Sequence, residues 1–248
     1  MHQAGGAFGH HRTQGRVAAP LGQNHLLAVL PSVQLEALLR HLEPVYLERG
    51  TCLYETGQPL GHVYFLTRGI VSLGCAATNG DTTELALVGP EGVIGVEAFL
   101  GSDESGHRAV ARTLCTGYRL RVSVARARFA EGGALQQALL KYARGLLLDI
   151  SQTSICNLHH SLEQRLCRSL LQGVDRIGSN TLPMTQDVLA DVVGAWRQGI
   201  SETVQKLRDR HLISCGRGSI TVLDRAGLLA RACECYVAVR LQTQRLQG

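Results

Sequence analysis

The residues with the clearest chemical potential lie between positions 196 and 210, where long polar side chains alternate with apolar ones. Ile200, Val204 and Leu207 recur at helical spacing, so a helix here would bury that face. The opposite face would carry Arg197, Gln198, Ser201, Glu202, Gln205 and Lys206. Arg donates two hydrogen bonds to guanine and Gln pairs similarly with adenine, whereas Ser suits a phosphate contact. The pattern predicts a helix that reads bases in the major groove of duplex DNA.

A shorter helix is predicted immediately before this one. Thr185 is a suitable N-cap for residues 186–193, and Asp187 complements the positive end of that helix. Gly194 stands where a left-handed residue would turn the chain into the next helix. Thr185 also suits a phosphate contact. Residues 185–212 thus form a predicted helix-turn-helix, although a helical hairpin with a solvated polar face would show the same local pattern.

A basic hairpin tip downstream strengthens the DNA interpretation. Two β-rich runs, residues 212–215 and 219–223, flank Gly216-Arg217-Gly218 and predict a wing. Arg217 would touch the DNA backbone or enter a minor groove. Eight Arg and Lys against six Asp and Glu between positions 160 and 223 add only weak electrostatic support. For Trp196 we expect packing against the first helix, with contact to a thymine methyl group or a sugar as the alternative.

The bulk properties bound the class of protein. The chain has 248 residues, enough for two domains, and 45% hydrophobic with 18% charged residues indicates a globular protein. The net charge of +5 permits a polyanionic partner without requiring one. No run approaches the length of a membrane span, and residues 1–17 lack the apolar segment of a secretory signal. We therefore expect a cytoplasmic protein with reduced thiols, beginning with a flexible tail over residues 1–23.

Residues 24–133 predict a sensor domain built on a β-roll. Asn24 and Ser32 are expected to cap two short helices. Between positions 44 and 124, β-rich runs alternate with Gly, which is typical of an antiparallel barrel or jelly roll. Asn79-Gly80-Asp81 suits a hairpin turn.

Residues 134–158 predict a dimerisation helix about 38 Å long. Its wide apolar stripe consists of Leu135, Leu139, Leu140, Ala143, Leu146, Leu147 and Ile150. The roll would cover one side and a second copy the other, although packing only within one chain is the alternative. Residues 159–248 form the predicted DNA-binding domain. A capping box at Ser161 and Gln164 is expected to begin its first helix, and Asp224 is expected to cap one final helix through Leu228 and Tyr236. The fold class is therefore α+β: a jelly-roll-like β-roll, a long helix and a winged helix-turn-helix.

The chain resembles the Crp/Fnr superfamily of transcription regulators over about residues 26–223. The resemblance is carried by Thr185-Gln186-Asp187-Val188-Leu189-Ala190, by Gly194, Arg197 and Ile200-Ser201, and by His62-Val63-Tyr64-Phe65 with Gly69-Ile70-Val71-Ser72-Leu73. It implies a homodimer, a sensory roll and a two-fold symmetric operator in double-stranded DNA, with RNA polymerase as a further candidate partner. Arg197 matches a base-reading Arg of the cyclic-AMP receptor branch. Gln198 and Glu202 stand where many members carry Glu and Arg, so the usual half-sites are not assumed.

The effector-binding residues of the roll match those of the family less well than the helix-turn-helix does. In cyclic-nucleotide-binding members a Gly-Glu pair and an Arg hold the ribose and the phosphate. Here Gly95 fits, Val96 occupies the Glu position, and Glu97 and Arg108 are each displaced by about one residue. We expect a roll that keeps its shape without a cyclic nucleotide, and hence no cofactor. A shifted cassette that does bind one is the alternative.

The Cys and His residues give little sign of a metal or an enzyme. Eight Cys are scattered, and Cys233 and Cys235 form a C-x-C for which incidental thiols are the expectation. The N-terminus lacks the closely spaced Cys residues of iron–sulfur members, and no His is singled out for haem. We expect no metal. A small jelly-roll metalloenzyme is one alternative, but it would need paired His residues and a carboxylate as metal ligands. A regulatory module that acts on protein partners is another, but it would not need a wing.

Overall fold

The computed structural model describes residues 20–76 and 82–247. The predicted turn at Asn79-Gly80-Asp81 and most of the predicted tail lie outside these residues. The tail prediction extended too far, because Leu21–Gln23 form the 3-10 helix η1 at the edge of the roll. Proline at position 20 supplies a fixed φ at its start.

Two antiparallel sheets form the β-roll, as predicted. The three-stranded sheet has the order β1-β7-β3, and the four-stranded sheet has the order β2-β6-β4-β5. The strands are β1 (Glu43–Leu47), β2 (Cys52–Tyr54), β3 (His62–Arg68), β4 (Val71–Ala76), β5 (Thr82–Val88), β6 (Arg108–Ala111) and β7 (Cys115–Arg121). A 3-10 helix, η2 (Val96–Leu100), lies between β5 and β6.

Two short helices close one end of the roll. In α1 (His25–Ala28) the side chain of Asn24 accepts from the backbone N–H of Leu27, as predicted. The N-cap of α2 (Ser32–Leu39) is Pro31 rather than Ser32, so that assignment was one residue late. Proline at the cap position costs no hydrogen bond because the first N–H groups of a helix have no intrahelical partner.

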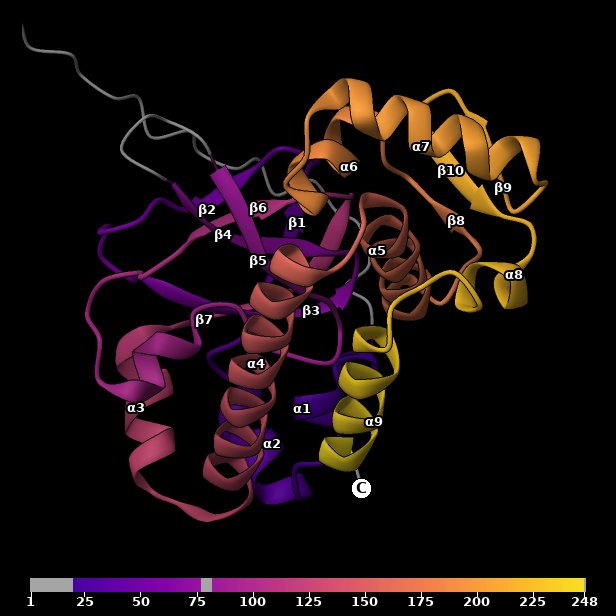
Figure 1. Ribbon diagram of the computed structural model, residues 1–248. Coiled ribbons are helices and arrows are strands. Elements are labelled where there is room, and N and C mark those ends of the chain that lie inside the picture. Colours follow the sequence, from indigo (N-terminus) through magenta and orange to yellow (C-terminus); the bar gives the residue numbers. More distant parts are fainter. Residues whose placement is uncertain (1–19, 77–81, 248) are drawn as a thin grey trace, which may run out of the picture.

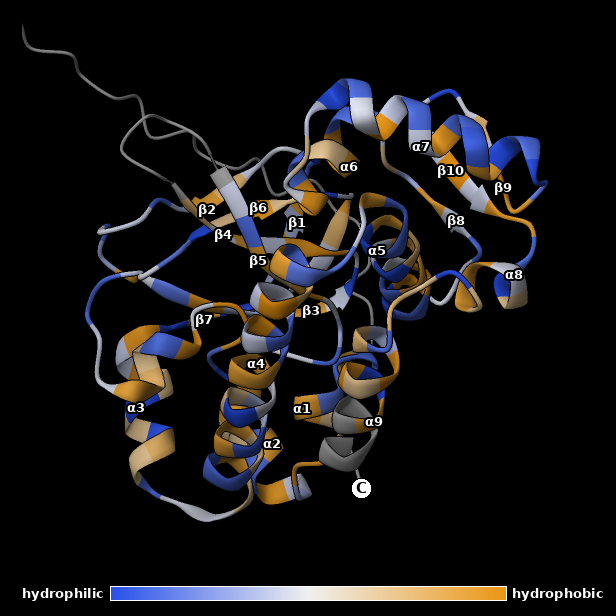
Figure 2. Ribbon diagram, in the orientation of Figure 1, coloured by the Kyte–Doolittle hydropathy of each residue, from blue (hydrophilic) through white to orange (hydrophobic). Residues whose placement is uncertain are grey.

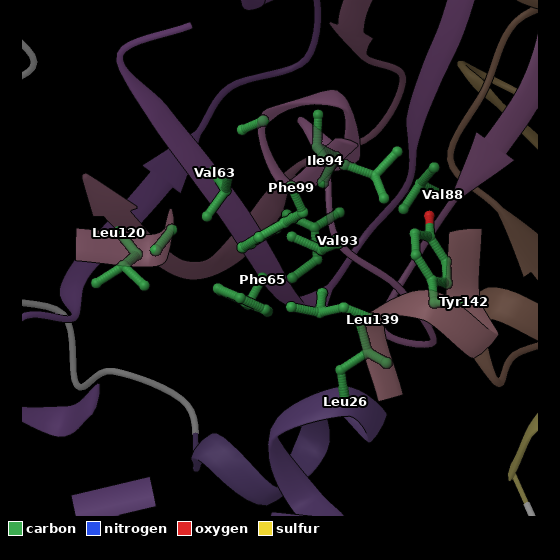
Figure 3. Packing of buried hydrophobic residues seen from close by; sticks show 14 of the residues in the cluster. Leu26, Val63, Phe65, Val88, Val93, Ile94, Phe99, Leu120, Leu139 and Tyr142 are labelled. Carbon is green, nitrogen blue, oxygen red and sulfur yellow. The ribbon is translucent and has the colours of Figure 1, made fainter. Parts of the chain in front are cut away.

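The long predicted helix is present as α4 (Gly133–His159), preceded by α3 (Val122–Ala130). Its inner face carries Leu139 and Tyr142, which pack with Phe65 and Val93 in the core between the sheets and α4 (Figure 3). Its other face is open: Leu140 is 48% exposed and Leu147 is 63% exposed. Most of the predicted stripe is therefore covered within the chain, and Leu140 and Leu147 are the two members left exposed.

The C-terminal domain has its own hydrophobic core, separate from that of the roll. Its elements are α5 (Leu162–Ile177), β8 (Thr181–Leu182), α6 (Gln186–Val193), α7 (Arg197–Asp209), β9 (Ile213–Gly216), β10 (Ser219–Val222), α8 (Arg225–Leu229) and α9 (Cys235–Gln247). The capping box of Ser161 and Gln164 opens α5 as predicted. The single final helix was wrong, because Asp224 caps only the short α8 and the chain restarts as α9 beside α4 (Figure 1).

The two domains touch through more than their linker. Helix α6 packs against β5 of the roll, and α9 lies along α4 (Figure 1). The roll thus lies in direct contact with the segment predicted to bind DNA.

In the described residues no helix is long and apolar enough to cross a bilayer.

Candidate nucleic-acid interface

The turn between α6 and α7 has the local geometry that its sequence predicts. The Thr185 hydroxyl accepts from the N–H of Val188 and caps α6. Gly194 has φ 62° and ψ 51°, and its N–H closes the end of α6 on Ala190 and Asp191. A residue with a β-carbon would be strained in this left-handed conformation. The turn therefore fixes the direction in which α7 leaves.

Helix α7 is held by one buried face. Ile200 and Leu207 are fully buried and Val204 is 1% exposed, and all three belong to the core of the C-terminal domain. Burying three such side chains stabilises the helix by about 1.5–3 kcal/mol each. The opposite face is mostly hydrophilic and lies at the rim of the molecule (Figure 2). The amphipathic pattern thus presents a whole polar face to solvent.

The predicted contact residues of α7 all lie on that exposed face. They are Arg197, Gln198, Ser201, Glu202 and Lys206. Arg197 and Gln198 are the first two residues of the helix, where base contacts of a recognition helix concentrate. The side chain of Arg197 is 75% exposed. Length, position and exposure allow Arg197 to reach into a groove.

These polar groups pair with residues of α6 and with one another. Arg197 Nε lies 2.9 Å from Asp187 Oδ1, and the amide of Gln198 donates to Glu202 Oε1 at 3.2 Å. Ser201 donates to the side chain of Gln186 at 3.0 Å. An exposed ion pair such as that of Arg197 and Asp187 contributes only about 0–1 kcal/mol, and the two exposed hydrogen bonds are of similar strength. They hold the side chains in place and are weak enough to be exchanged for contacts with DNA.

Trp196 does not pack against the first helix, contrary to our expectation. Its side chain is 91% exposed at the N-cap position of α7, next to Arg197. The backbone of Trp196 is extended (φ −63°, ψ 139°) just ahead of the first helical residue. An exposed tryptophan beside the base-reading residues adds a large apolar surface to the interface.

The wing is a short antiparallel hairpin. Strands β9 and β10 pair with Gly216 opposite Ser219, and β8 extends the sheet on the other side of β10. Arg217 is exposed at the tip, and Gly218 has φ 77°, which the tight turn requires. The tip therefore offers one exposed guanidinium on a rigid hairpin.

The predicted effector residues of the roll lie around η2 but do not converge. Gly95 is left-handed, with φ 88°, and Val96 is buried at the start of η2. Glu97 Oε1 lies 2.7 Å from His107 Nδ1. Burial acts to raise the pKa of Glu97, but the hydrogen bond to His107 and a backbone hydrogen bond outweigh it and lower the pKa. The carboxylate is charged and already has a partner.

Arg108 is directed to a different carboxylate. Its Nε donates to both oxygens of Glu55, at 3.1 and 3.0 Å, at the outer end of β2. Tyr54 donates to the carbonyl of His62 at 2.5 Å, and its hydroxyl lies 2.8 Å from where a β-carbon on Gly95 would be. The groups expected to hold a phosphate and a ribose are thus engaged by separate protein partners.

Comparison with known proteins agrees with this architecture. A model of the cyclic nucleotide-binding domain matches residues 44–131, and one of the Crp-like helix-turn-helix domain matches residues 164–231. A CRP-like cAMP-activated global transcriptional regulator of Mycobacterium tuberculosis is 24% identical over 208 residues, which cover 80% of this chain and 92% of the relative. A global nitrogen regulator of Nostoc is 27% identical over 187 residues, covering 71% and 82%.

Solved structures show the same fold. FixK2 from Bradyrhizobium japonicum has a TM-score of 0.68 at 17% identity, covering 77% of this chain and 98% of that one. A CRP/FNR-family transcriptional regulator from Thermus thermophilus, TTHA1359, has a TM-score of 0.64 at 24% identity, with the same coverage. The roll, the long helix and the winged helix-turn-helix follow one another in this order, and the two matched models together cover more than half of the chain. The chain therefore belongs to the Crp/Fnr superfamily of transcription regulators.

Proposed function

We propose that the protein regulates transcription as a homodimer that reads an inverted repeat through Arg197 and Gln198. The observation that carries the proposal is the exposed N-terminal end of α7, where Trp196, Arg197 and Gln198 follow one another on a helix whose other face is buried. Base edges in the major groove present the acceptors and donors that these two polar side chains match. Thr185, Ser201, Lys206 and Arg217 would contact the phosphate backbone, with Glu202 between them on the reading face.

The exposed face of α4 supports the homodimer. Leu140, Leu147 and Leu158 are 48%, 63% and 79% exposed, and Ile155 is 49% exposed. Their positions recur at intervals of seven, eight and three residues, close to the seam of a two-stranded coiled coil. A second copy related by a two-fold axis would cover this stripe and place two α7 helices about 34 Å apart. That spacing demands an inverted repeat in the DNA.

The effector part of the proposal is that cyclic AMP is not the signal. A bound cyclic phosphate needs a cation and backbone donors to replace its water. Arg108 is paired with Glu55, and Glu97 with His107. Either the protein binds DNA without an effector or its signal is of another kind. No catalytic role is proposed, and RNA polymerase stays a candidate partner without an assigned contact surface.

The test is selection of bound sequences from a random pool, followed by affinity measurements on the selected site. We expect an inverted repeat with half-sites about one helical turn apart. Arg197→Ala should weaken binding to that site by about 1–3 kcal/mol and relax the preference at one position. Arg128→Ala, which removes a cation from α3 in the roll, is the matched control and should leave DNA binding unchanged. Equal losses on selected and random DNA would refute base reading by Arg197.

A further inference from the structure

Four side chains that are far apart in the sequence meet where the long helix joins the DNA-binding domain. Cys156 and His160 are one turn apart at the end of α4, Cys233 lies two residues before α9, and Cys235 is the first residue of α9. One ligand atom from each of the four lies within 4.8 Å of every other. Cys156, Cys233 and Cys235 are at most 3% exposed and form a buried cluster separate from both hydrophobic cores.

We propose that these four residues bind one Zn²⁺ ion as a tetrahedral Cys3His site. Cysteine thiolates and a histidine nitrogen are the donors that structural zinc sites use. Zinc–sulfur bonds of about 2.3 Å in a tetrahedron place neighbouring donors about 3.8 Å apart. Here the Sγ atoms of Cys156 and Cys233 are 3.4 Å apart, and Cys235 Sγ is 3.5 Å from His160 Nδ1. The donors are therefore already close to the spacing that one ion requires.

The surroundings of the donors match those of a metal site. His160 turns Nδ1 toward the thiols, and its Nε2 lies 3.2 Å from Glu234 Oε1. A carboxylate on the far nitrogen fixes the tautomer and the ring orientation of a zinc-bound histidine. The amide of Gln152 donates to Cys235 Sγ at 3.0 Å, as donors to coordinated thiolates do. Arg165 and Arg168 line the same depression as Cys156 and offset the net negative charge of Zn²⁺ with three thiolates.

The spacing also selects zinc over two other uses of cysteine. Iron–sulfur clusters distribute their ligands over two or more iron atoms, so some of the donors must lie farther apart than the 4.8 Å that contains all four here. A disulfide between Cys156 and Cys233 would require the sulfurs to close to about 2.05 Å. It would also leave Cys235 and His160 without a role. One mononuclear ion uses all four donors.

The site would fasten α9 to α4 beside the domain junction. His160 is the C-cap residue of α4, with an extended backbone, and Ser161 caps α5. Sequence reasoning missed the site because the two pairs of donors are separated by more than 70 residues, and a lone C-x-C is weak evidence. Only the return of α9 to the end of α4, visible in Figure 1, brings the pairs together.

The decisive measurement is the metal content of the full-length protein, purified untagged with a phosphine reductant and no chelator. We expect one zinc per chain, no iron and no acid-labile sulfide by elemental and sulfide analysis. Replacing zinc with Co²⁺ should give the visible absorption of a tetrahedral thiolate site. The wild-type protein alone thus decides the proposal, whether or not every variant folds. Reduced protein that takes up no zinc in competition with a chromogenic chelator would overturn it, as would bound iron with sulfide.

Variants then assign the ligands. Cys156→Ser, Cys233→Ser and Cys235→Ser should each lose most of the zinc, and His160→Ala should bind it at least tenfold more weakly. Cys215→Ser on the wing and His159→Ala, at the exposed neighbouring position, are the matched controls and should retain it. Glu234→Ala should keep the stoichiometry at saturating zinc but weaken the affinity about 10–100-fold. Zinc retained in all four ligand variants, or an intact Cys156–Cys233 disulfide found by mass spectrometry in reduced protein, would refute the site.

Discussion

Arg112 of the β-roll lies 3.2 Å, from Nη1 to Oδ2, from Asp191 of helix α6, and so joins the sensor domain directly to the helix-turn-helix. The same guanidinium donates from Nε to Ser72 at 2.7 Å and lies 3.7 Å from the buried carboxylate of Glu84. Arg112 therefore stands between the buried Glu84 inside the roll and the exposed Asp191 on the DNA-binding domain. Any shift of β4 or β5 that moves Glu84 would change this contact.

The two ion pairs of Arg112, with Asp191 and with Glu84, should contribute differently to the free energy of unfolding. Asp191→Asn removes only an ion pair whose acid is 53% exposed, and should lower the free energy of unfolding by less than about 1 kcal/mol. Arg112→Ala leaves Glu84 buried without its cation, and should cost on the order of 3 kcal/mol above pH 8. Urea unfolding of both variants measures the difference. Equal losses would mean that the interdomain pair, rather than the buried one, carries the stability.

Glu84 should make stability depend on pH in the neutral range. Burial raises its pKa from 4.5 to about 8, opposed mainly by Arg112. The folded protein therefore holds a proton that the unfolded chain releases, so the free energy of unfolding falls as the pH rises from about 4.5 to about 8. Glu84→Gln should flatten this dependence and raise stability at pH 8 by up to a few kcal/mol. Glu104→Gln at an exposed position is the control, and an unchanged slope in Glu84→Gln would contradict the assignment.

Trp196 should matter for DNA binding and not for folding. Because the side chain is 91% exposed, Trp196→Ala should change the free energy of unfolding by no more than about 0.5 kcal/mol. The loss of a large apolar contact with a sugar or a thymine methyl group should weaken binding to the selected site by about 1 kcal/mol or more. Chemical unfolding and fluorescence anisotropy measure the two quantities. A large loss of stability with unchanged DNA affinity would restore the packing role that we first expected.

The exposed stripe of α4 should hold two copies together. Leu147→Glu places a charge at its centre, where Leu147 is 63% exposed in one chain, so the monomer fold tolerates it. We expect a dimer for the wild-type protein and a monomer for the variant at micromolar concentration, measured by light scattering. The control is Leu223→Glu, which changes a leucine of similar exposure, 57%, in the C-terminal domain. A wild-type monomer that binds a non-palindromic site would contradict the proposal.

Most of the fold could be predicted from interactions between residues close in the sequence, whereas the contacts between distant segments could not be predicted. The Thr185 cap, the Gly194 turn and the Ser161 capping box depend on neighbours within four residues, and the structure has all three. The direction of the Trp196 side chain depends on how α7 leaves the turn, which no spacing rule encodes. The break after Leu229 and the return of α9 to Cys156 depend on tertiary packing alone.

The same distinction applies to the effector residues of the roll. From the sequence, Glu97 and Arg108 are both about one residue away from a usable register, and a bulge could realign them. In the structure Glu97 is paired with His107 and Arg108 with Glu55, and neither partner could be identified from the spacing.

Titration calorimetry with cyclic AMP and cyclic GMP should accordingly give no binding heat at millimolar nucleotide. To hold a phosphate, Arg108 must give up the bifurcated hydrogen bond from its Nε to the two carboxylate oxygens of Glu55. Glu55→Ala should therefore release Arg108 and still not create a tight site, because Val96 gives the ribose hydroxyl no acceptor and Glu97 stays paired with His107. DNA binding should be the same with and without either nucleotide. Tight one-to-one binding by the wild-type protein, abolished in Arg108→Ala, would instead mean that η2 and β6 shift by one residue when the nucleotide binds.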